Sequence, residues 1–195
     1  MRADFTLYTP EYISGVMSLR KPQKKSLEIL DIIVNSVNLK KGMNLQAALG
    51  AVKALYPTCT DFERDFMSLT FALATGVGKT RLMGAFIAYL YTQHNIKNFF
   101  VVAPNTTIYN KLCRDLNDNN SPKYVFRGLS CFVNAPQVIT GEDYRSKPLS
   151  LFQSEVRIFV FNISKFDKEN ANMKKVNEYY GDSFFETLAK QIGRA

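Results

Sequence analysis

Apolar and polar positions in the first third of the chain follow the period of a helix. Within residues 22–38, apolar side chains recur at spacings of three and four, at Leu27, Leu30, Ile33, Val34 and Val37. A one-sided apolar stripe is typical of an amphipathic helix, and Pro22 suits the first turn, where a missing N–H group costs nothing. A second helix is predicted over residues 44–55, followed by a polar connection over residues 58–65.

From residue 68 onward, short apolar runs alternate with helical patterns. Strands are predicted at 68–74, 99–103, 124–129, 137–140 and 157–163, and helices at 80–94, 105–116 and around 184–192. The run at 99–103 is uninterrupted, which predicts a strand buried on both faces. Strands that alternate with helices of these lengths need crossover connections, so we expect an α/β fold with a mostly parallel sheet.

The composition indicates a folded chain with a positive surface. Of the 195 residues, 46% are apolar and 22% are charged, which does not fit a disordered chain. The formal net charge of +8 suits a polyanionic partner such as nucleic acid, and it also suits simple solubility. The longest nearly apolar run, residues 82–91, is too short to span a bilayer, and we expect no secretory signal.

The cysteines and the histidine exclude several kinds of site. Cys59, Cys113 and Cys131 are odd in number and form no C-x-x-C pair, so we expect neither a disulfide framework nor a zinc site. This usage fits a reducing cytoplasm. His94 is the sole histidine and follows an apolar helical stretch, so we interpret it as a helix-end residue rather than a ligand or base.

The turn between the first predicted strand and its helix reads Ala-Thr-Gly-Val-Gly-Lys-Thr, at residues 74–80. These residues match the second half of the pattern G-x-x-x-x-G-K-[ST] of phosphate-binding loops, although Leu73 stands where the pattern has its first glycine. The context is the one that the motif requires, because an apolar run precedes it and an amphipathic helix follows it. A turn that only joined a strand to a helix would explain the glycines but not the Lys-Thr pair.

Each residue of this loop has a chemical reason to be there. Gly76 and Gly78 allow backbone conformations that are closed to other residues, and so let amide groups at a helix start face a phosphate. Lys79 is expected to reach the β- and γ-phosphates of a nucleotide, and the Thr80 hydroxyl to complete a Mg²⁺ shell. The loop therefore predicts a nucleoside triphosphate site.

The same residues resemble motif I of superfamily 2 helicases, in the form found in the restriction (Res) subunits of type I and type III restriction enzymes. Residues 99–112 resemble motif Ia, residues 137–141 the strand that follows it, and residues 157–165 the strand and turn before the acidic box. Leu-Arg-Lys-Pro-Gln, at residues 19–23, is similar to the element whose glutamine reads adenine. The resemblance implies a RecA-like P-loop NTPase, a three-layer αβα sandwich that is incomplete here and carries an N-terminal helical extension.

The resemblance also implies ATP and Mg²⁺ as cofactors, and nucleic acid, DNA more than RNA, as a partner. The positions that it assigns to ATP are Thr75, Gly76, Val77, Gly78, Lys79 and Thr80, with Gln23 at the adenine and Thr80 also at Mg²⁺. The positions that it assigns to the nucleic-acid backbone are Asn105, Thr106, Thr107, Ser164 and Lys165. Residues 105–107 are also a good helix N-cap, Gln23 also suits the first turn of an ordinary helix, and Lys165 also suits a solvated surface.

The resemblance divides the chain into a helical extension, residues 1–66, and a partial RecA-like ATP-binding domain, residues 67–195. The acidic Asp-Glu-x-His segment that completes such a site is absent, so no catalytic residue is identified and enzyme activity stays open. We therefore expect the first portion of a larger cytoplasmic motor that translocates on DNA, acts with a modification or nuclease subunit, and hydrolyses little ATP through this portion alone. A small P-loop phosphotransferase and a non-catalytic remnant are the alternatives.

Overall fold

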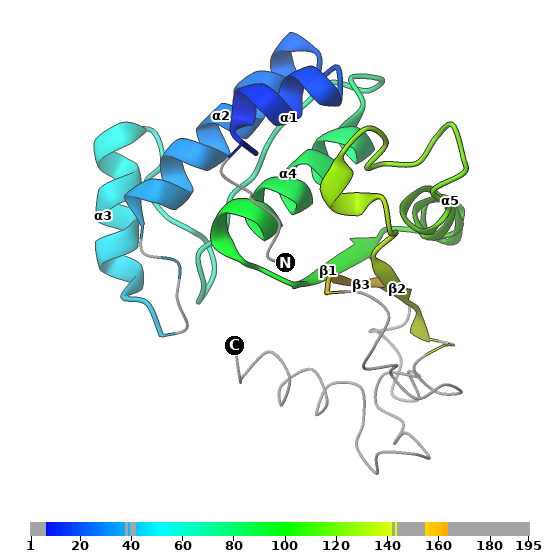
Figure 1. Cartoon of the computed structure of the whole chain (residues 1–195). Coiled ribbons are helices and arrows are strands. Elements are labelled where there is room, and N and C mark those ends of the chain that lie inside the picture. Colours follow the sequence, from blue (N-terminus) through cyan, green and yellow to red (C-terminus); the bar gives the residue numbers. More distant parts are fainter. Residues whose placement is uncertain (1–6, 38, 40–41, 142, 144–154, 164–195) are drawn as a thin grey trace, which may run out of the picture.

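The computed structural model describes residues 7–37, 39, 42–141, 143 and 155–163. Its elements, in chain order, are α1 (Pro10–Val16), α2 (Lys21–Ser36), α3 (Leu45–Leu55), α4 (Lys79–His94), β1 (Asn98–Ala103), α5 (Thr106–Asn117), the 3-10 helix η1 (Ser130–Phe132), β2 (Gln137–Ile139) and β3 (Arg157–Asn162) (Figure 1). The predicted helix around residues 184–192 lies outside the described residues.

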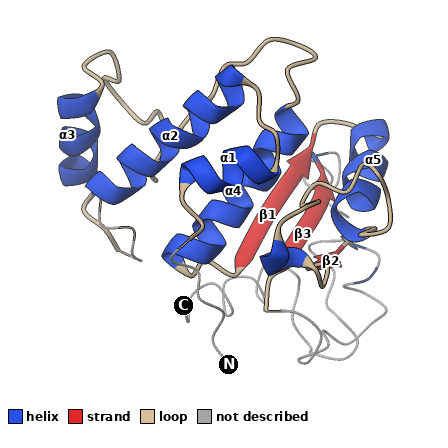
Figure 2. Ribbon diagram, turned by 45° about the horizontal axis from the view of Figure 1, so that its top comes forward, coloured by secondary structure: helices blue, strands red, loops and turns tan. Residues whose placement is uncertain are grey.

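The three described strands form a parallel sheet in the order β1-β3-β2. Asn98 of β1 and Gln137 of β2 both lie opposite Arg157 of β3, and Ala103 lies opposite Asn162. Helix α5 packs against all three strands, and Figure 2 shows α1, α2 and α4 on the other side of β1. The prediction of an α/β fold with a parallel sheet is therefore confirmed.

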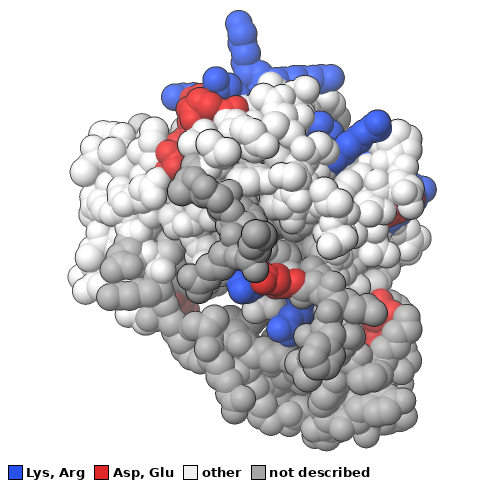
Figure 3. All heavy atoms as spheres, in the orientation of Figure 1, with Lys and Arg blue, Asp and Glu red and all other residues white. Residues whose placement is uncertain are grey.

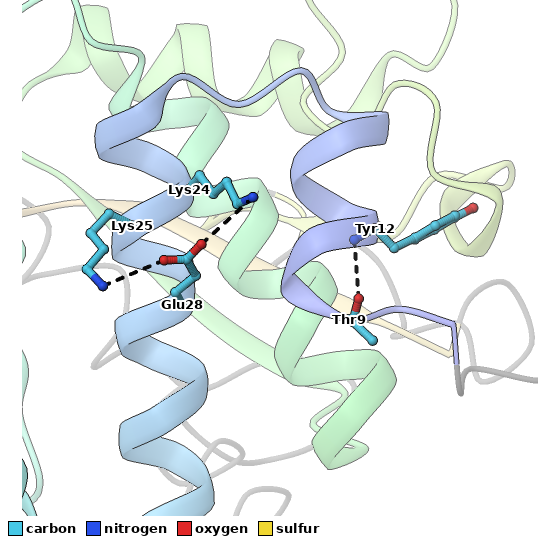
Figure 4. A network of polar contacts seen from close by, with 5 residues as sticks. All are labelled: Thr9, Tyr12, Lys24, Lys25 and Glu28. Atoms are coloured by element: carbon cyan, nitrogen blue, oxygen red, sulfur yellow. Dashed lines mark hydrogen bonds and ion pairs between the residues drawn. The ribbon is translucent and has the colours of Figure 1, made fainter.

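Two of the N-terminal helices, α1 and α3, begin at a residue whose side chain caps them. Helices α2 and α3 confirm the predictions for residues 22–38 and 44–55, and Asn44 caps α3 by accepting from the amides of its first turn. The sequence pattern missed α1, whose seven residues are too few to show a helical period. Thr9 Oγ1 caps α1 by accepting a 3.2 Å hydrogen bond from the Tyr12 amide (Figure 4).

The segment at residues 68–74 is not a strand, which corrects the prediction. It is half-buried at Leu69, Phe71 and Leu73 and exposed at the positions between them, as an extended chain with one covered face would be. Phe71 packs on Phe86 of α4 with their ring centroids 4.9 Å apart. No strand of the described structure pairs with this segment, so it has the side-chain pattern of a strand without the backbone ladder.

Strand β1 departs from its prediction in a related way. Residues 99–103 were expected to be buried on both faces, but Phe100 is 40% exposed and Val102 is 45% exposed. Both side chains lie on one face of the strand, because they alternate with half-buried Val101 and buried Ala103. The apolar run therefore predicted the strand correctly and its environment incorrectly.

Residues 124–129 form successive turns rather than the predicted strand. The amides of Tyr124, Arg127 and Leu129 each donate to the carbonyl oxygen three positions earlier. The segment is apolar because it is folded over α4, where Val125 lies directly against Gly84. Its aromatic and β-branched residues therefore reflect burial in a covering loop and not sheet pairing.

One apolar core joins the two parts of the chain that the resemblance separates. It combines α1 and α2 with α4, α5, β3 and the covering loop, through buried Ile13, Leu27, Ala88, Leu116, Phe126 and Ile158. A smaller core lies between α2, α3 and Phe62. The division of the chain at residues 66 and 67 stays a prediction. Among the described helices, none combines the length and the apolar character needed to cross a membrane.

Candidate functional site

The predicted phosphate loop is a tight turn that leads into α4. Gly76 has φ +80° and Gly78 has φ +94°, so both adopt the left-handed conformation that only glycine reaches without strain. Gly78 is also the N-cap of α4, and Lys79 and Thr80 form its first turn. The structural reason for the two glycines is therefore the one expected from the sequence.

The polar groups of this loop are open to an anion. No hydrogen bond from the backbone amides of residues 75–78 is found within the described part of the chain. Lys79 is exposed and makes no ion pair with any described carboxylate. Unpaired amides and a cation at the positive end of a 16-residue helix are the features that bind phosphate in proteins.

Side chains near the junction between α1 and α2 donate hydrogen bonds to carbonyl groups of this loop. Arg20 Nη1 donates to the Gly76 carbonyl oxygen over 3.1 Å, and Gln23 Nε2 donates to the Gly78 carbonyl oxygen over 2.9 Å. In return, Arg81 Nε on the first turn of α4 donates to the Met17 carbonyl oxygen over 2.6 Å. The sequence analysis missed Arg20 and Arg81, although Arg20 lies within the 19–23 segment that it had identified.

Gln23 lies against the loop and is only 2% exposed. Its Oε1 accepts a 2.7 Å hydrogen bond from the Arg20 amide, so this side chain satisfies a backbone donor at the start of α2. A primary amide has two donor hydrogens and two acceptor lone pairs, so one of each remains beyond these two bonds. Adenine contact by Gln23 stays a prediction, and the bond to Gly78 is an additional role that the sequence did not indicate.

Positive charges gather near the loop. The start of α2 carries Arg20, Lys21, Lys24 and Lys25, and Glu28 pairs with the last two. Figure 3 shows Lys and Arg side chains beside acidic ones on the part of the surface over α1 and α2. Burial, and then the positive charge of Arg127, lower the pKa of Arg81. A like charge held near Arg81 indicates a local positive potential, which favours an anionic ligand.

Thr80 is half-buried in the first turn of α4, beside Lys79. Its position in the loop fits the predicted contact with Mg²⁺, because hydroxyl oxygen is a ligand that this cation accepts. Within the described ranges, no group of three His, Cys, Asp or Glu side chains is placed to hold a metal ion. A Mg²⁺ ion bound here would take further ligands from nucleotide phosphates and water, as such ions commonly do.

The second predicted surface lies at the carboxyl ends of β1 and β3. Asn105 is the N-cap of α5, and its Oδ1 accepts a 2.9 Å hydrogen bond from the Ile108 amide. Asn162 Nδ2 at the end of β3 donates to Thr106 Oγ1 over 3.2 Å, and Thr107 is exposed. The structure thus brings residues 105–107 and Asn162 together at one edge of the sheet.

Contact of this edge with nucleic acid stays a prediction, since a helix cap and a phosphate contact would use the same side chains. The predicted contacts Ser164 and Lys165 lie outside the described residues. Asn162, which the sequence analysis did not single out, belongs to this edge because it closes the strand before Ser164.

His94 is the last residue of α4, as the sequence predicted. One ring nitrogen lies 3.2 Å from the Tyr89 hydroxyl, which also donates to Asp31 of α2. Burial lowers the pKa of His94 and raises the pKa of Tyr89. This polar group connects α2 with the end of α4 that lies farthest from the phosphate loop.

One of three comparisons with known proteins identifies a family for this chain. Neither the curated proteins nor the solved structures include a match to the chain. The family model described as "Type III restriction enzyme, res subunit" matches residues 16–188, a span that includes Arg20, Gln23, the whole phosphate loop and the 105–107 edge. Because that match covers most of the chain, the protein belongs to the family of type III restriction enzyme res subunits, and its α/β fold is a P-loop fold.

Proposed function

We propose that this chain binds ATP together with Mg²⁺ through residues 75–80. The observation that carries the proposal is the loop before α4, with two glycines at positive φ. Among the described residues, the amides of residues 75–78 have no hydrogen-bond acceptor and Lys79 has no ion-pair partner. The amides and the helix dipole would bind the phosphate oxygens, Lys79 would neutralise the terminal phosphates, and Thr80 would contribute a ligand to Mg²⁺. Mg²⁺, when bound, would reduce the negative charge of the phosphates.

We further propose that the ATP site serves a motor that acts on nucleic acid, and on DNA rather than RNA. The family membership, the net charge of +8 and the edge formed by residues 105–107 and Asn162 support this. Coupled hydrolysis, a modification or nuclease partner and a cytoplasmic location belong to the same proposal. The sequence has no Asp-Glu-x-His segment, so we expect this chain to bind ATP without measurable turnover.

Titration calorimetry with ATP and Mg²⁺ tests the nucleotide site. Replacing Lys79 with alanine removes a charge-assisted hydrogen bond worth about 1.5–3 kcal/mol, so the Kd should rise about tenfold or more. Lys53→Ala removes the same charge from α3, which lies on the other side of α2 from α4 (Figure 1), and should leave the Kd unchanged. Equal affinity of the wild-type chain and Lys79→Ala would overturn the proposal and favour a non-catalytic remnant.

A further inference from the structure

Two carbonyl groups of the phosphate loop are held by side chains from one helix start. Arg20 bonds to Gly76 and Gln23 bonds to Gly78, although about 55 residues separate each pair along the chain. We propose that Arg20 is a positioning residue that sets the orientation of the phosphate loop, and that Gln23 shares this role. This proposal rests on the proposed ATP site and assigns a role in phosphate binding to the start of α2, which lies outside the loop.

The orientation of a carbonyl group fixes the orientation of the next amide. In a planar trans peptide, the C=O of one residue and the N–H of the following residue point in opposite directions. The bond from Arg20 to the Gly76 oxygen therefore points the Val77 amide away from Arg20. The bond from Gln23 to the Gly78 oxygen likewise points the Lys79 amide away from Gln23. These are two of the amides that would face a phosphate.

Arg20 contributes more to the orientation of the Gly76 carbonyl than Gln23 contributes to that of the Gly78 carbonyl. The Gly78 oxygen also accepts from the amides of Arg81 and Leu82 in the first turn of α4, so the helix already orients it. For the Gly76 oxygen, Arg20 is the hydrogen-bond donor found within the described residues. Since glycine has the largest backbone freedom, losing Arg20 releases the peptide that most needs a partner.

The Gln23 side chain also bonds to the backbone at the start of α2. The Arg20 amide donates to Gln23 Oε1 over 2.7 Å, and the same Gln23 side chain donates to the loop, so the start of α2 and the loop share one hydrogen-bonded chain. Arg81 reinforces the contact from the opposite direction through the Met17 carbonyl. The junction between α1 and α2 is therefore joined to the loop and to the start of α4 by several hydrogen bonds.

If Arg20 positions the loop, its loss affects one set of ligands, and if it contacts adenine, its loss affects another. A residue that reads adenine affects ATP and leaves ligands without a base unchanged. A residue that orients the loop amides affects every ligand with a polyphosphate, because those amides bind the phosphates. Inorganic tripolyphosphate, which has no base and no ribose, separates the two roles.

The experiment measures the affinity of the whole chain for ATP and for tripolyphosphate, each with Mg²⁺, by titration calorimetry. The wild-type chain is compared with two variants at position 20 and one at position 24. Arg20→Ala should weaken both ligands by the same factor, about fivefold to tenfold. Arg20→Lys keeps a donor of similar reach and should recover most of that loss. Lys24→Ala removes one positive charge from the same helix start without touching the loop, since Lys24 pairs with Glu28, and should weaken binding less than twofold (Figure 4).

The outcomes separate the positioning role from the ATP site itself. Loss of ATP affinity with unchanged tripolyphosphate affinity in Arg20→Ala would overturn the positioning role alone. An equal loss in Lys24→Ala and Arg20→Ala would also overturn it, because general charge would then explain the effect. Absence of binding in the wild-type chain, with no difference from Lys79→Ala, would instead overturn the proposed ATP site. Far-ultraviolet circular dichroism of each variant identifies any loss of folding, and Arg20→Lys keeps the test valid if Arg20→Ala unfolds.

Discussion

Gly84 shows how a single missing side chain allows two segments to touch. A Cβ atom at this position would lie 2.1 Å from Val125 Cγ1, far closer than atoms can approach. Helix α4 and the covering loop at residues 124–129 can therefore meet only where α4 carries glycine. The sequence showed a glycine within a helical pattern, but its reason lay in a loop about 40 residues further along.

We expect Gly84→Ala to lower the free energy of unfolding by about 1–3 kcal/mol, because the added methyl group must displace the covering loop. Gly50→Ala is the matched control, since Gly50 is exposed in the middle of α3 and a Cβ atom there meets nothing within 4 Å. That substitution should stabilise the chain by about 0.5–1 kcal/mol through helix propensity. Urea denaturation of both variants checks the pair, and equal effects would contradict the close packing.

The loop glycines and Gln23 show what was predictable at the scale of single residues. The positive φ values of Gly76 and Gly78 follow from the motif, because the chemistry of a phosphate loop leaves few other residues suitable. The orientation of Gln23 could not follow from the motif, since it depends on how α2 packs against a loop distant in the chain. Local conformation was predictable, whereas contacts between distant residues were not.

Helix α5 begins at a cap that has two competing explanations. Asn105 accepts a hydrogen bond from the Ile108 amide, as an N-cap does, and it also lies at the carboxyl edge of the sheet, where nucleic acid is proposed to bind. Aspartate caps a helix as well as asparagine but repels phosphate. The two explanations therefore respond differently to one substitution.

We expect Asn105→Asp to preserve the thermal stability of the chain and to weaken its binding to single-stranded DNA severalfold. Asn105→Ala should cost about 1 kcal/mol of stability, because it removes the cap. Fluorescence anisotropy at one fixed salt concentration measures the DNA affinity. Gln46→Glu, an exposed change of equal charge on α3, is the control, and equal weakening by both acidic variants would indicate a general charge effect.

The longer helices were predicted correctly because the spacing of apolar residues that defines a helix lies within one segment of the chain. Helices α2, α3, α4 and α5 carry their own apolar positions at helical spacing, and asparagine caps α3 and α5, so their sequences were sufficient. Residues 68–74 have an equally clear apolar alternation, yet a strand also needs a neighbour that accepts its backbone hydrogen bonds. That requirement lies outside the segment and could not be seen in it.

The stability of the whole molecule should decline in alkaline solution, because burial favours the neutral forms of a cysteine thiol and a tyrosine phenol. Burial raises the pKa of Cys131 from 9.0 to about 11, and burial together with Glu155 raises the pKa of Tyr91 from 10.0 to about 12. Folding therefore favours the neutral forms, so their contribution is fully present below pH 9 and is lost as the pH rises from 9 to 12.

We expect the free energy of unfolding to be flat from pH 7 to 8.5 and to fall above pH 9. Tyr91→Phe should make the decline between pH 10 and 12 shallower, because the variant has no phenol to ionise there. Gly50→Ala on α3 changes no titratable group and should leave the shape of the profile unchanged. Urea denaturation at several pH values measures the profile, and parallel curves for wild type and Tyr91→Phe would contradict the expectation.

The order of the strands has a consequence for synthesis on the ribosome. β1 and β2 do not pair with each other, and both pair with β3, which is the last of the three to be made. A nascent chain that ends before residue 157 thus holds two strands with no ladder between them, and the sheet can close only when residues 157–162 leave the exit tunnel. During that interval the unpaired backbone of β1 is a surface on which another chain can add a strand, so chaperone binding should be greatest just before β3 emerges.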